Sequence, residues 1–528
     1  MRWAAVVTSV LVVGVSGCGV GSGGPESTSH GDERTATQQP MERASSPVQH
    51  QERDQQSSRA TNEERGRPGT DAWRMRRPAT GRQIEGYTTA VSGLPGTKLG
   101  LKVSTTARTF RVLAFRAGDY RGGAARLVWR SDDVRGHRQP GPAFAPHGTR
   151  TVVADWRRSL TVDTADWPEG FYVLLLRSSA GWDTHVPYIV SSRSARGTIA
   201  LVAPVTTWQA YNSWGGYSLY EGPPDDRRSH AVSFDRPYYG VGGMNSFRIA
   251  VMPIVQRAEA SGERLSYFAN VDLHARRDAL AGARGYMSMG HDEYWTPDMR
   301  KRVMDARDAG TNLAFLGANT MYWRVRLDDR RTGPMRLLTG YRDDAYADPR
   351  RETHPREATS RFRDAPAAMP ENDLVGMLYE CYPVDAPYRV VSPGWWGFRG
   401  TGARHGTEIP GLVGGESDRV YPDARTPRPL QILSHVSFSC RGVTTTSQSV
   451  YYTTRSGAGV FTAGTLRWGC ALVDSCDRPL GRRTRDFARQ VTDNLLREYA
   501  RGPVGERHPA RDNVAEFDLP LTNGVTAS

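Results

Sequence analysis

The feature that most constrains the fold of this chain is a change of hydrophobic pattern at about Gly197. Between about residues 83 and 192, short β-prone segments such as "TFRVLAFRAG" and "FYVLLLR" are separated by Gly, Pro, Asp and Ser clusters. No helical period appears there, and strands bounded by such turn residues are typical of all-β folds. We therefore expect an antiparallel β-sandwich over residues 81–193.

After Gly197, unbroken apolar segments alternate with helical ones. "TIALVAPV", "RLSYFANVD", "RGYMSMG" and "TNLAFLGA" read as strands, and "TPDMRKRVMDARDAG" reads as a helix between two of them. Strands of continuous hydrophobicity that alternate with helices indicate a parallel sheet covered on both faces. We expect an open, mostly parallel α/β sheet over residues 194–502 and a peripheral tail over residues 503–528.

The first eighteen residues have the pattern of an export signal. Arg2 precedes an apolar stretch too short to span a bilayer, and small residues lead to Cys18. This resembles a bacterial lipobox with lipid attachment at Cys18, and a plain signal peptide with a chance cysteine is the alternative. Residues 19–80 are polar and low in apolar side chains, so we expect a disordered tether. The protein is then lipid-anchored on the outer face of the cell membrane, or secreted.

The net charge of +13 raises the question of a nucleic-acid partner. Lysine occurs only at positions 98, 102 and 301, so nearly all the positive charge is arginine. The arginines are interleaved with acids, as in "RRSDD" and "LDDRR", and form no single basic stripe. We predict a solvated surface and no nucleic-acid partner.

Four cysteines besides Cys18 point to two disulfides in an exported chain. Cys470 and Cys476 flank a short loop and are the natural first pair, which leaves Cys381 with Cys440. A zinc site built from the four thiolates is the rival, but the chain has no C-x-x-C pair.

The segment "GHDEYW", residues 290–295, carries the most suggestive chemistry. It follows an apolar strand and precedes a helix that we expect to begin with Thr296 as N-cap and to end at Gly310. The carboxyl ends of parallel strands are where ligands bind in open α/β sheets. His291 and Glu293 are two residues apart and would point to one side. Such a pair can bind a metal, move a proton or form a buried hydrogen-bonded pair.

Other mechanisms lack their motifs. The chain has no H-E-x-x-H, no G-x-S-x-G or G-x-C-x-G elbow, and no G-x-G-x-x-G between a strand and a helix. A water activated by a metal is therefore a more economical hypothesis than a side-chain nucleophile.

Several longer motifs occur together in one order: "AYNSWGGYSLY", "VSFDRPY", "VDLH", "GHDEYW", "DAGTNLAFLGANTMYWRVR" and "GLVGGESDR". In this order they resemble the C-terminal catalytic region of the large subunit of N,N-dimethylformamidase, and the likeness runs from about Gln83 to Tyr499. The resemblance implies hydrolysis of the C–N bond of a small amide. We expect the α/β region to be glutamine-amidotransferase-like in architecture.

The resemblance also implies a mononuclear Fe(III) held by two tyrosine phenolates and one glutamate. By motif these would be Tyr211, Glu293 and, from a shorter match, Tyr172. His291, Asn319 and Glu416 would be the neighbouring catalytic groups. This chain has an arginine, Arg342, where the family tends to carry a lysine, and that difference concerns the substrate more than the metal.

Each of these residues also has an ordinary structural explanation. Tyr172 in a strand is by default a sandwich core residue, and Tyr211 lies among aromatics that can form an apolar wall. Glu416 can belong to a surface ion pair, and Asn319 to a turn. The alternatives to the hydrolase are a non-catalytic cell-envelope binding protein, whose aromatics would suit flat ligands, and a zinc site with His291 as ligand. A small partner subunit or a homo-oligomer is a further possibility.

Overall fold

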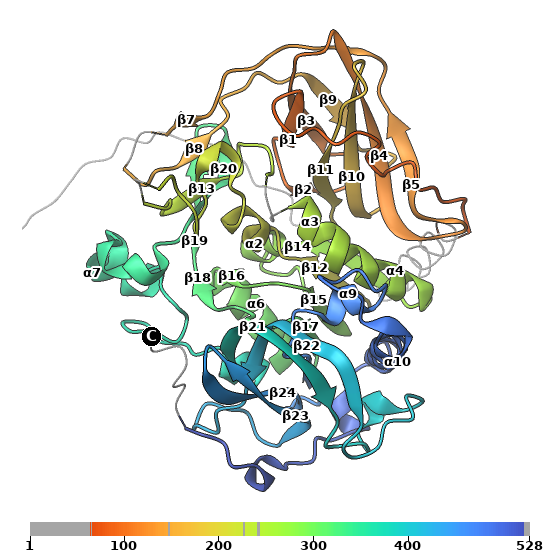
Figure 1. Cartoon of the computed structure of the whole chain (residues 1–528), viewed down its shortest axis with the longest axis vertical. Helices are drawn as coiled ribbons and strands as arrows, with labels where there is room; N and C mark the ends of the chain where they lie inside the picture. Colours follow the sequence, from red (N-terminus) through yellow and green to blue (C-terminus); the bar gives the residue numbers. More distant parts are fainter. Residues whose placement is uncertain (1–63, 65, 146–147, 225–226, 240–242, 522–528) are drawn as a thin grey trace, which may run out of the picture. The chain divides into compact units, whose positions relative to one another are not determined.

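The computed structural model describes residues 64, 66–145, 148–224, 227–239 and 243–521. It is a mixed α/β structure, with many strands in several sheets and few helices (Figure 1). The signal segment, Cys18 and most of the predicted tether lie outside the described residues. Within the described residues, no helix is long and apolar enough to cross a membrane.

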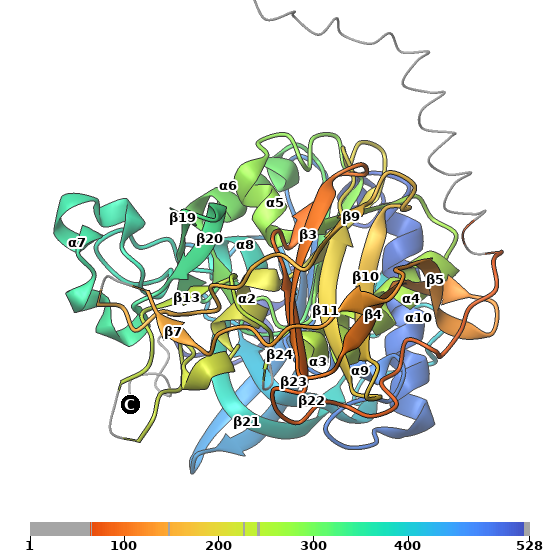
Figure 2. The same cartoon turned by 90° about the horizontal axis from the view of Figure 1, so that it is seen from above.

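The strands up to residue 190 form two main sheets and a small ribbon (Figure 2). A three-stranded sheet has the order β1-β3-β9, and a second sheet has the order β2-β11-β10-β4-β5 with β6 beside β4. The pairings are antiparallel except that of β11 with β2. The bounds are β1 Ile84–Thr88, β2 Ser92–Gly93, β3 Lys98–Thr105, β4 Thr109–Tyr120, β5 Gly123–Arg130, β6 Val134–Arg135, β7 Ala143–Phe144, β8 Val152–Val153, β9 Leu160–Asp163, β10 Gly170–Ser178 and β11 Asp183–Val190.

Strand β10 explains why "FYVLLL" is continuously apolar. Because successive side chains of a strand point to opposite faces, Tyr172 and Leu174 join a core cluster shared by these two sheets. Phe171 and Val173 belong instead to the large core that includes the rest of the chain. The strand is thus buried on both faces, which fixes the N-terminal sheets against the following region.

The largest sheet has seven strands in the order β14-β12-β15-β17-β25-β24-β23. Five neighbouring strands are parallel, and the β25–β24–β23 pairings are antiparallel. The apolar runs of the sequence form the fully buried strands β12, β14, β15 and β17. The bounds are β12 Ile199–Ala203, β14 Leu265–Ala269, β15 Gly285–Met289, β17 Asn312–Leu316, β23 Leu430–Cys440, β24 Val443–Thr453 and β25 Gly459–Thr462.

Helices lie on both sides of this sheet (Figures 1 and 2). Helices α4, α9 and α10 pack together on one side, and α5 and α6 pack together on the other. Helix α6 begins as expected, because Thr296 Oγ1 accepts a hydrogen bond from Met299 N at 3.2 Å. The bounds are α2 Val205–Ala210, α3 Met244–Ser246, η2 Phe247–Val251, α4 Met252–Ala260, α5 Asn270–Ala275, α6 Pro297–Asp308, α9 Trp468–Ala471 and α10 Gly481–Tyr499.

The order of the strands reverses at one point in the sheet, between β12 and β15. The parallel strands β12, β14, β15, β17 and β25 follow one another in the chain, but β12 lies between β14 and β15. The chain therefore leaves β12 toward one edge and returns to build the other edge from β15 onward. At such a point, open α/β sheets form a crevice outside the carboxyl ends of the strands, where ligands bind.

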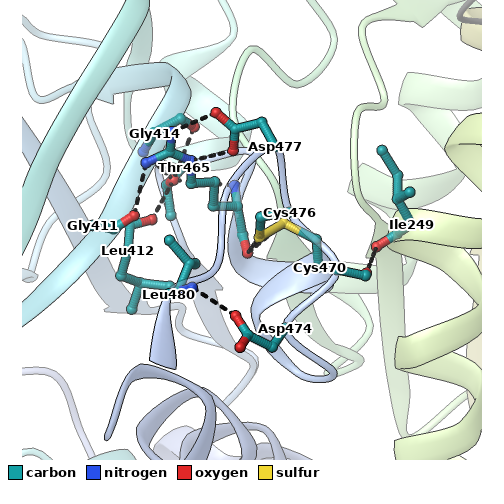
Figure 3. Close-up of a disulfide and its surroundings, with 12 residues drawn as sticks. Ile249, Gly411, Leu412, Gly414, Thr465, Cys470, Asp474, Cys476, Asp477 and Leu480 are labelled. Atoms are coloured by element: carbon teal, nitrogen blue, oxygen red, sulfur yellow. Dashed lines mark hydrogen bonds and ion pairs between the residues drawn. A yellow bond between two sulfur atoms is a disulfide. The ribbon is translucent and has the colours of Figure 1, made fainter. Parts of the chain in front are cut away.

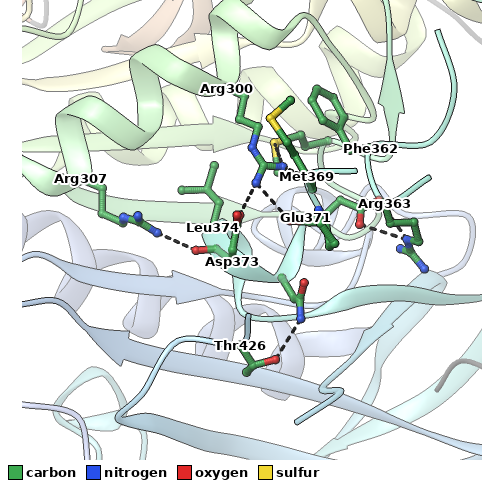
Figure 4. A network of polar contacts seen from close by, with 12 residues as sticks. Arg300, Arg307, Phe362, Arg363, Met369, Glu371, Asp373, Leu374 and Thr426 are labelled. Atoms are coloured by element: carbon green, nitrogen blue, oxygen red, sulfur yellow. Dashed lines mark hydrogen bonds and ion pairs between the residues drawn. The ribbon is translucent and has the colours of Figure 1, made fainter. Parts of the chain in front are cut away.

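The loop-rich region after β17 contains short strands, an antiparallel ribbon and small helices. The ribbon pairs β21 with β22, and Figure 4 shows the polar network where buried Arg300 of α6 reaches Met369 O and the carboxylate of Asp373. The bounds are β13 Ala231–Ser233, β16 Tyr294–Trp295, β18 Trp323–Arg324, β19 Arg326–Arg330, β20 Gly333–Thr339, η3 Arg342–Ala347, α7 Arg350–Thr353, α8 Asn372–Val375, β21 Leu378–Arg389 and β22 Glu408–Arg419.

Both disulfides have the expected pairing. Cys381 is bonded to Cys440, and Cys470 is bonded to Cys476. The second bridge closes the turn after α9, next to the Ser475 hydroxyl that donates to Ile249 O (Figure 3). The four thiols are thus used in pairs and not as one zinc site.

Two sequence-based boundaries need correction. The last part of the predicted tether, residues 66–80, is packed: Trp73 is 2% exposed, and Pro68, Thr70 and Pro78 make bridges to strand residues. The first part of the predicted peripheral tail is also packed, since Asn513 exchanges hydrogen bonds with the backbone of Ile432. Only a few side chains of these two segments are buried. Most of their residues are therefore polar, and the sequence contains little sign that the segments are packed.

Candidate active site

The end of strand β15 fixes the "GHDEYW" segment. Gly290 has φ 76°, and a β-carbon there would lie 2.7 Å from Ala250 Cβ, so only glycine fits the turn. Buried Asp292 accepts hydrogen bonds from Ser288 Oγ and Asn270 Nδ2 and points away from the crevice. Glu293 N donates to Thr207 Oγ1 at 3.0 Å, which anchors this segment to α2 after β12.

A closed loop after β12 supplies two tyrosines. Tyr211 is the C-cap residue of α2, and Tyr220 ends the loop, which is closed by a 3.0 Å bond from Leu219 N to Ala210 O. Gly215 and Gly216 have φ 79° and 87°, and they let the chain reverse. The rings of Tyr211 and Tyr220 stack with centroids 4.3 Å apart.

A buried arginine holds this loop from inside. Arg236 donates to the carbonyl oxygens of Asn212, Trp214 and Tyr217, and its side chain has no carboxylate partner among the described residues. Burial lowers the Arg236 pKa to about 9. The carbonyls of the loop are thus gathered around one cation, which positions Tyr211 and Tyr220 at the crevice.

The two phenols and His291 converge on the carboxylate of Glu293. Tyr211 Oη and Tyr220 Oη each donate to Glu293 Oε2 at 2.8 Å, and Tyr220 Oη is also 2.8 Å from Oε1. His291 Nε2 lies 3.0 Å from Glu293 Oε2. Glu293 is 3% exposed, so the cluster lies in a region of low dielectric where these bonds are strong.

The charges of the cluster are strongly coupled. Burial, followed by the Glu293 charge, raises the pKa values of both Tyr211 and Tyr220 well above the usual range. Burial opposes protonation of His291, but the charges of Glu416 and Glu293 outweigh it and raise the His291 pKa to about 9. Burial also works against the Glu293 carboxylate, but His291 keeps the Glu293 pKa below its ordinary value.

Glu416 on β22 lies near the same nitrogen of His291 as Glu293. Its Oε2 lies 3.7 Å from His291 Nε2, and burial raises the Glu416 pKa to about 7. Asn319 follows β17 with φ 56°, a conformation that asparagine tolerates, and its N–H donates to Asp418 Oδ1 at 2.8 Å. Glu416 Oε2 and Asn319 Oδ1 are buried and accept no hydrogen bond from the described residues. The Asn319 side chain forms a hydrogen bond to Glu416, which lowers the Glu416 pKa against the effect of burial.

Two further residues border the cluster. The Arg342 guanidinium lies 3.7 Å from the centre of the Tyr220 ring. Tyr294 is fully buried and packs edge-on against the stacked pair, with ring centroids 6.5 Å from Tyr211 and 6.3 Å from Tyr220. The Tyr294 hydroxyl has no hydrogen-bond partner within the described chain.

The structure brings together Tyr211, His291, Glu293, Asn319 and Glu416, but not Tyr172. Tyr172 lies in the core of the N-terminal sheets, where its hydroxyl donates to Pro168 O at 2.6 Å and its ring stacks on Trp167. The expectation for Tyr172 is therefore corrected. The strand alternation turns Tyr172 away from the α/β region, and Tyr220 occupies the place predicted for it beside Glu293.

The sequence contained a signal for Tyr220. It belongs to the same "AYNSWGGYSLY" motif as Tyr211, and the paired glycines between them indicate a reversal that can bring two ring side chains together. The role of Arg236 had no such signal, because its three partners are backbone carbonyls.

The described ranges contain no group of three or more His, Cys, Asp or Glu side chains placed to hold a metal. The cluster is instead rich in phenol and carboxylate oxygens, at the carboxyl end of an open parallel sheet. These features define the class: an α/β protein with a buried Tyr–Tyr–Glu centre flanked by a histidine and a second glutamate.

Comparison with known proteins supplies the family. The sequence profile of the family "N,N-dimethylformamidase beta subunit-like, C-terminal" matches residues 111–478, which is most of the chain. The chain belongs to this family, as the motifs predicted. A search of curated proteins gives no match.

Comparison with solved structures gives only a distant match. Eleven chains match, among them a cycloisomaltooligosaccharide glucanotransferase of Paenibacillus sp. in complex with cycloisomaltoheptaose. It is 10% identical, the match covers 44% of this chain and 38% of that one, and the TM-score is 0.14. A likeness at this level carries no argument about fold or function.

Proposed function

We propose that the protein is an iron-dependent hydrolase of a C–N bond in a small amide. The observation that carries the proposal is the convergence of Tyr211 and Tyr220 on Glu293, at the crevice between β12 and β15, in a chain of the dimethylformamidase-like family. The finer architecture is part of the proposal: a β-sandwich followed by a glutamine-amidotransferase-like region.

The donor set fits a hard, highly charged metal ion. Two phenolates and a carboxylate are oxygen anions, which favour Fe(III) over metals that prefer thiolates. Without a metal the two phenols are held neutral, with both hydroxyls pointing at one carboxylate. Tyr211, Tyr220 and Glu293 would hold the ion with these same oxygens. A bound Fe(III) supplies Lewis-acid chemistry, which polarises an amide carbonyl and makes water more acidic.

The other residues would position and move protons. His291 Nε2 holds Glu293 in one orientation and carries a proton that can pass to a leaving amine. Glu416 lies next to His291 and has a free acceptor oxygen for a proton taken from water. Asn319 forms a side-chain hydrogen bond to Glu416 and can hold this group in place for proton transfer.

The test of this function is the release of ammonia or amine from formamide, acetamide, their N-methyl derivatives and N-acetylglycine by the iron-loaded protein. We expect turnover, and His291→Gln should lower kcat by about 100-fold or more because it removes the proton donor. Tyr172→Phe, remote from the cluster, is the control and should keep full activity. An iron-loaded, folded protein that releases no ammonia or amine from any of these amides would refute the hydrolase.

A cell-envelope binding protein is the second candidate, and a cleft favours it. A space of about 510 Å³ lies beside the loop that carries the tyrosines, with Trp214, Tyr238 and 60%-exposed Tyr239 on one side and Arg82 on the other. Aromatic faces with a few polar groups suit flat ligands. This role requires no turnover, so the amine-release assay separates the two candidates.

The proposal also includes the cellular location and the partners of the protein. A lipid anchor at Cys18 would hold the protein at the outer face of the cell membrane, where the substrate is an amide met outside the cytoplasm. A small partner subunit or a homo-oligomer agrees with the "beta subunit-like" description of the family.

A further inference from the structure

Arg342 is held rigidly at the edge of the cluster. It begins η3, and its guanidinium carbon lies 3.7 Å from the centre of the Tyr220 ring and 4.8 Å from that of Trp323. Nη1 donates to Leu219 O at 2.5 Å. Stacking between two rings fixes the plane of the guanidinium and leaves one edge for other partners.

The guanidinium makes no direct ion pair within the described chain, although the charge of Glu293 acts on it from the cluster. Its two acidic neighbours are already used: Asp343 pairs with Arg361 at 3.1 Å, and Asp344 pairs with Arg228 and His230 at 3.1 and 3.0 Å. Arg342 Nε is buried and donates to no described residue. A buried charged donor that lacks a partner destabilises the protein, and a ligand that supplies the acceptor would remove this cost.

The free charge also faces the reacting centre. Arg342 stacks on the ring of Tyr220, and the hydroxyl of the same ring lies 2.8 Å from both Glu293 oxygens. A substrate whose amide is at Glu293 would therefore reach Arg342 with a second group only a few bonds away. The nearby Arg361 cannot serve, because Asp343 neutralises it.

We propose that Arg342 selects amides that carry a carboxylate near the scissile bond, of the N-acyl amino acid class. This inference rests on the proposed amide hydrolysis at the same site. A carboxylate matches the planar fork of a guanidinium and can accept two hydrogen bonds from its free edge. A neutral amide of the same size leaves the charge unpaired, so it binds more weakly.

The experiment compares N-acetylglycine with N-acetylglycinamide, two amides that differ in one charge. Binding to the full-length protein is measured by calorimetry, and hydrolysis is measured with the iron-loaded protein. We expect a tenfold to hundredfold preference for the acid, in line with about 1.5–3 kcal/mol for a charged hydrogen bond. Arg342→Gln should reduce this ratio to near one, and Arg342→Lys should keep part of it. Arg361→Gln is the matched control and should leave the ratio unchanged.

The two measurements separate failure of the inference from failure of the function. Hydrolysis of both amides at equal rates, or a ratio that Arg342→Gln does not change, would overturn the role of Arg342 and leave the hydrolase intact. If neither amide is hydrolysed, the function fails, and calorimetry still decides: loss of N-acetylglycine binding in Arg342→Gln supports the subsite. If N-acetylglycine does not bind, or binds to Arg342→Gln as tightly as to the wild type, the proposed subsite is overturned.

Discussion

At the scale of single residues, the centre of this protein is a set of buried acids whose protonation differs from that of free side chains. Glu293 remains a carboxylate because His291 and two phenols donate to it or lie beside it. Asp418 accepts a hydrogen bond from the Asn319 N–H, and its pKa shifts in the opposite direction to that of Glu293. Burial raises the Asp418 pKa to about 7. The same burial thus gives two carboxyl groups different charges at neutral pH.

This difference predicts a pH dependence of stability. The pKa of Asp418 is higher in the folded chain than its ordinary 3.8, so the folded state binds the proton more tightly. The contribution of Asp418 is present below pH 3.8 and is lost as the pH rises through about 7, by up to roughly 1.4 kcal/mol per pH unit. Urea unfolding between pH 4 and 8 should show a less negative slope for Asp418→Asn than for wild type. Exposed Asp278→Asn should keep the wild-type slope, and an equal slope in Asp418→Asn would contradict the assignment.

Some site residues could be predicted from the sequence and others could not. Tyr211, His291 and Glu293 follow the strands of an open sheet, and the carboxyl ends of neighbouring parallel strands meet at one edge. The prediction for Tyr172 was wrong because a short motif does not show which core a side chain enters. The alternation of the strand turns Tyr172 to the face that packs in the core of the N-terminal sheets. Arg236 was missed because it binds backbone carbonyls, which leave no mark in the side-chain pattern.

At the scale of elements, the loop from Tyr211 to Tyr220 depends on Arg236. Arg236→Met removes bonds to three carbonyls and leaves them buried without donors, so unfolding should need about 2–4 kcal/mol less free energy. Hydrogen exchange of residues 212–219 should accelerate, because the loop opens locally before the sheet does. Arg331→Met, whose side chain is 88% exposed, should change neither quantity. Unaltered exchange in Arg236→Met would show that the loop holds itself.

The positions of the strands could be predicted because each apolar run has a length and a pattern of hydrophobicity that are typical of strands. "FYVLLL" was expected as a strand, and its continuous hydrophobicity agrees with burial on both faces in β10. The order of the strands in the seven-stranded sheet could not be read from the sequence, since it depends on pairings between residues far apart in the chain.

At the scale of the whole molecule, the segment before β1 belongs to the folded part. Trp73 is buried, buried Glu64 pairs with Arg126 of β5 at 2.7 Å, and Thr70 and Pro78 form bridges to β5 and β11, so Glu64 and residues 66–80 pack against the second N-terminal sheet. A chain that begins at residue 61 should unfold like the full-length protein. One that begins at residue 81 should lose about 3 kcal/mol or more, mainly from the buried tryptophan. Equal urea midpoints for the two shortened chains would contradict this packing.

The central claim is that Tyr211, Tyr220 and Glu293 form one iron centre, and the most direct measurement is the visible spectrum and iron content of the chain that begins at residue 61. The account predicts a phenolate-to-iron charge-transfer band and about one iron per chain. Tyr211→Phe, Tyr220→Phe and Glu293→Gln should each lose both, and Tyr172→Phe should keep both. A colourless, iron-free but folded protein, or a band that survives Tyr220→Phe and disappears in Tyr172→Phe, would contradict it.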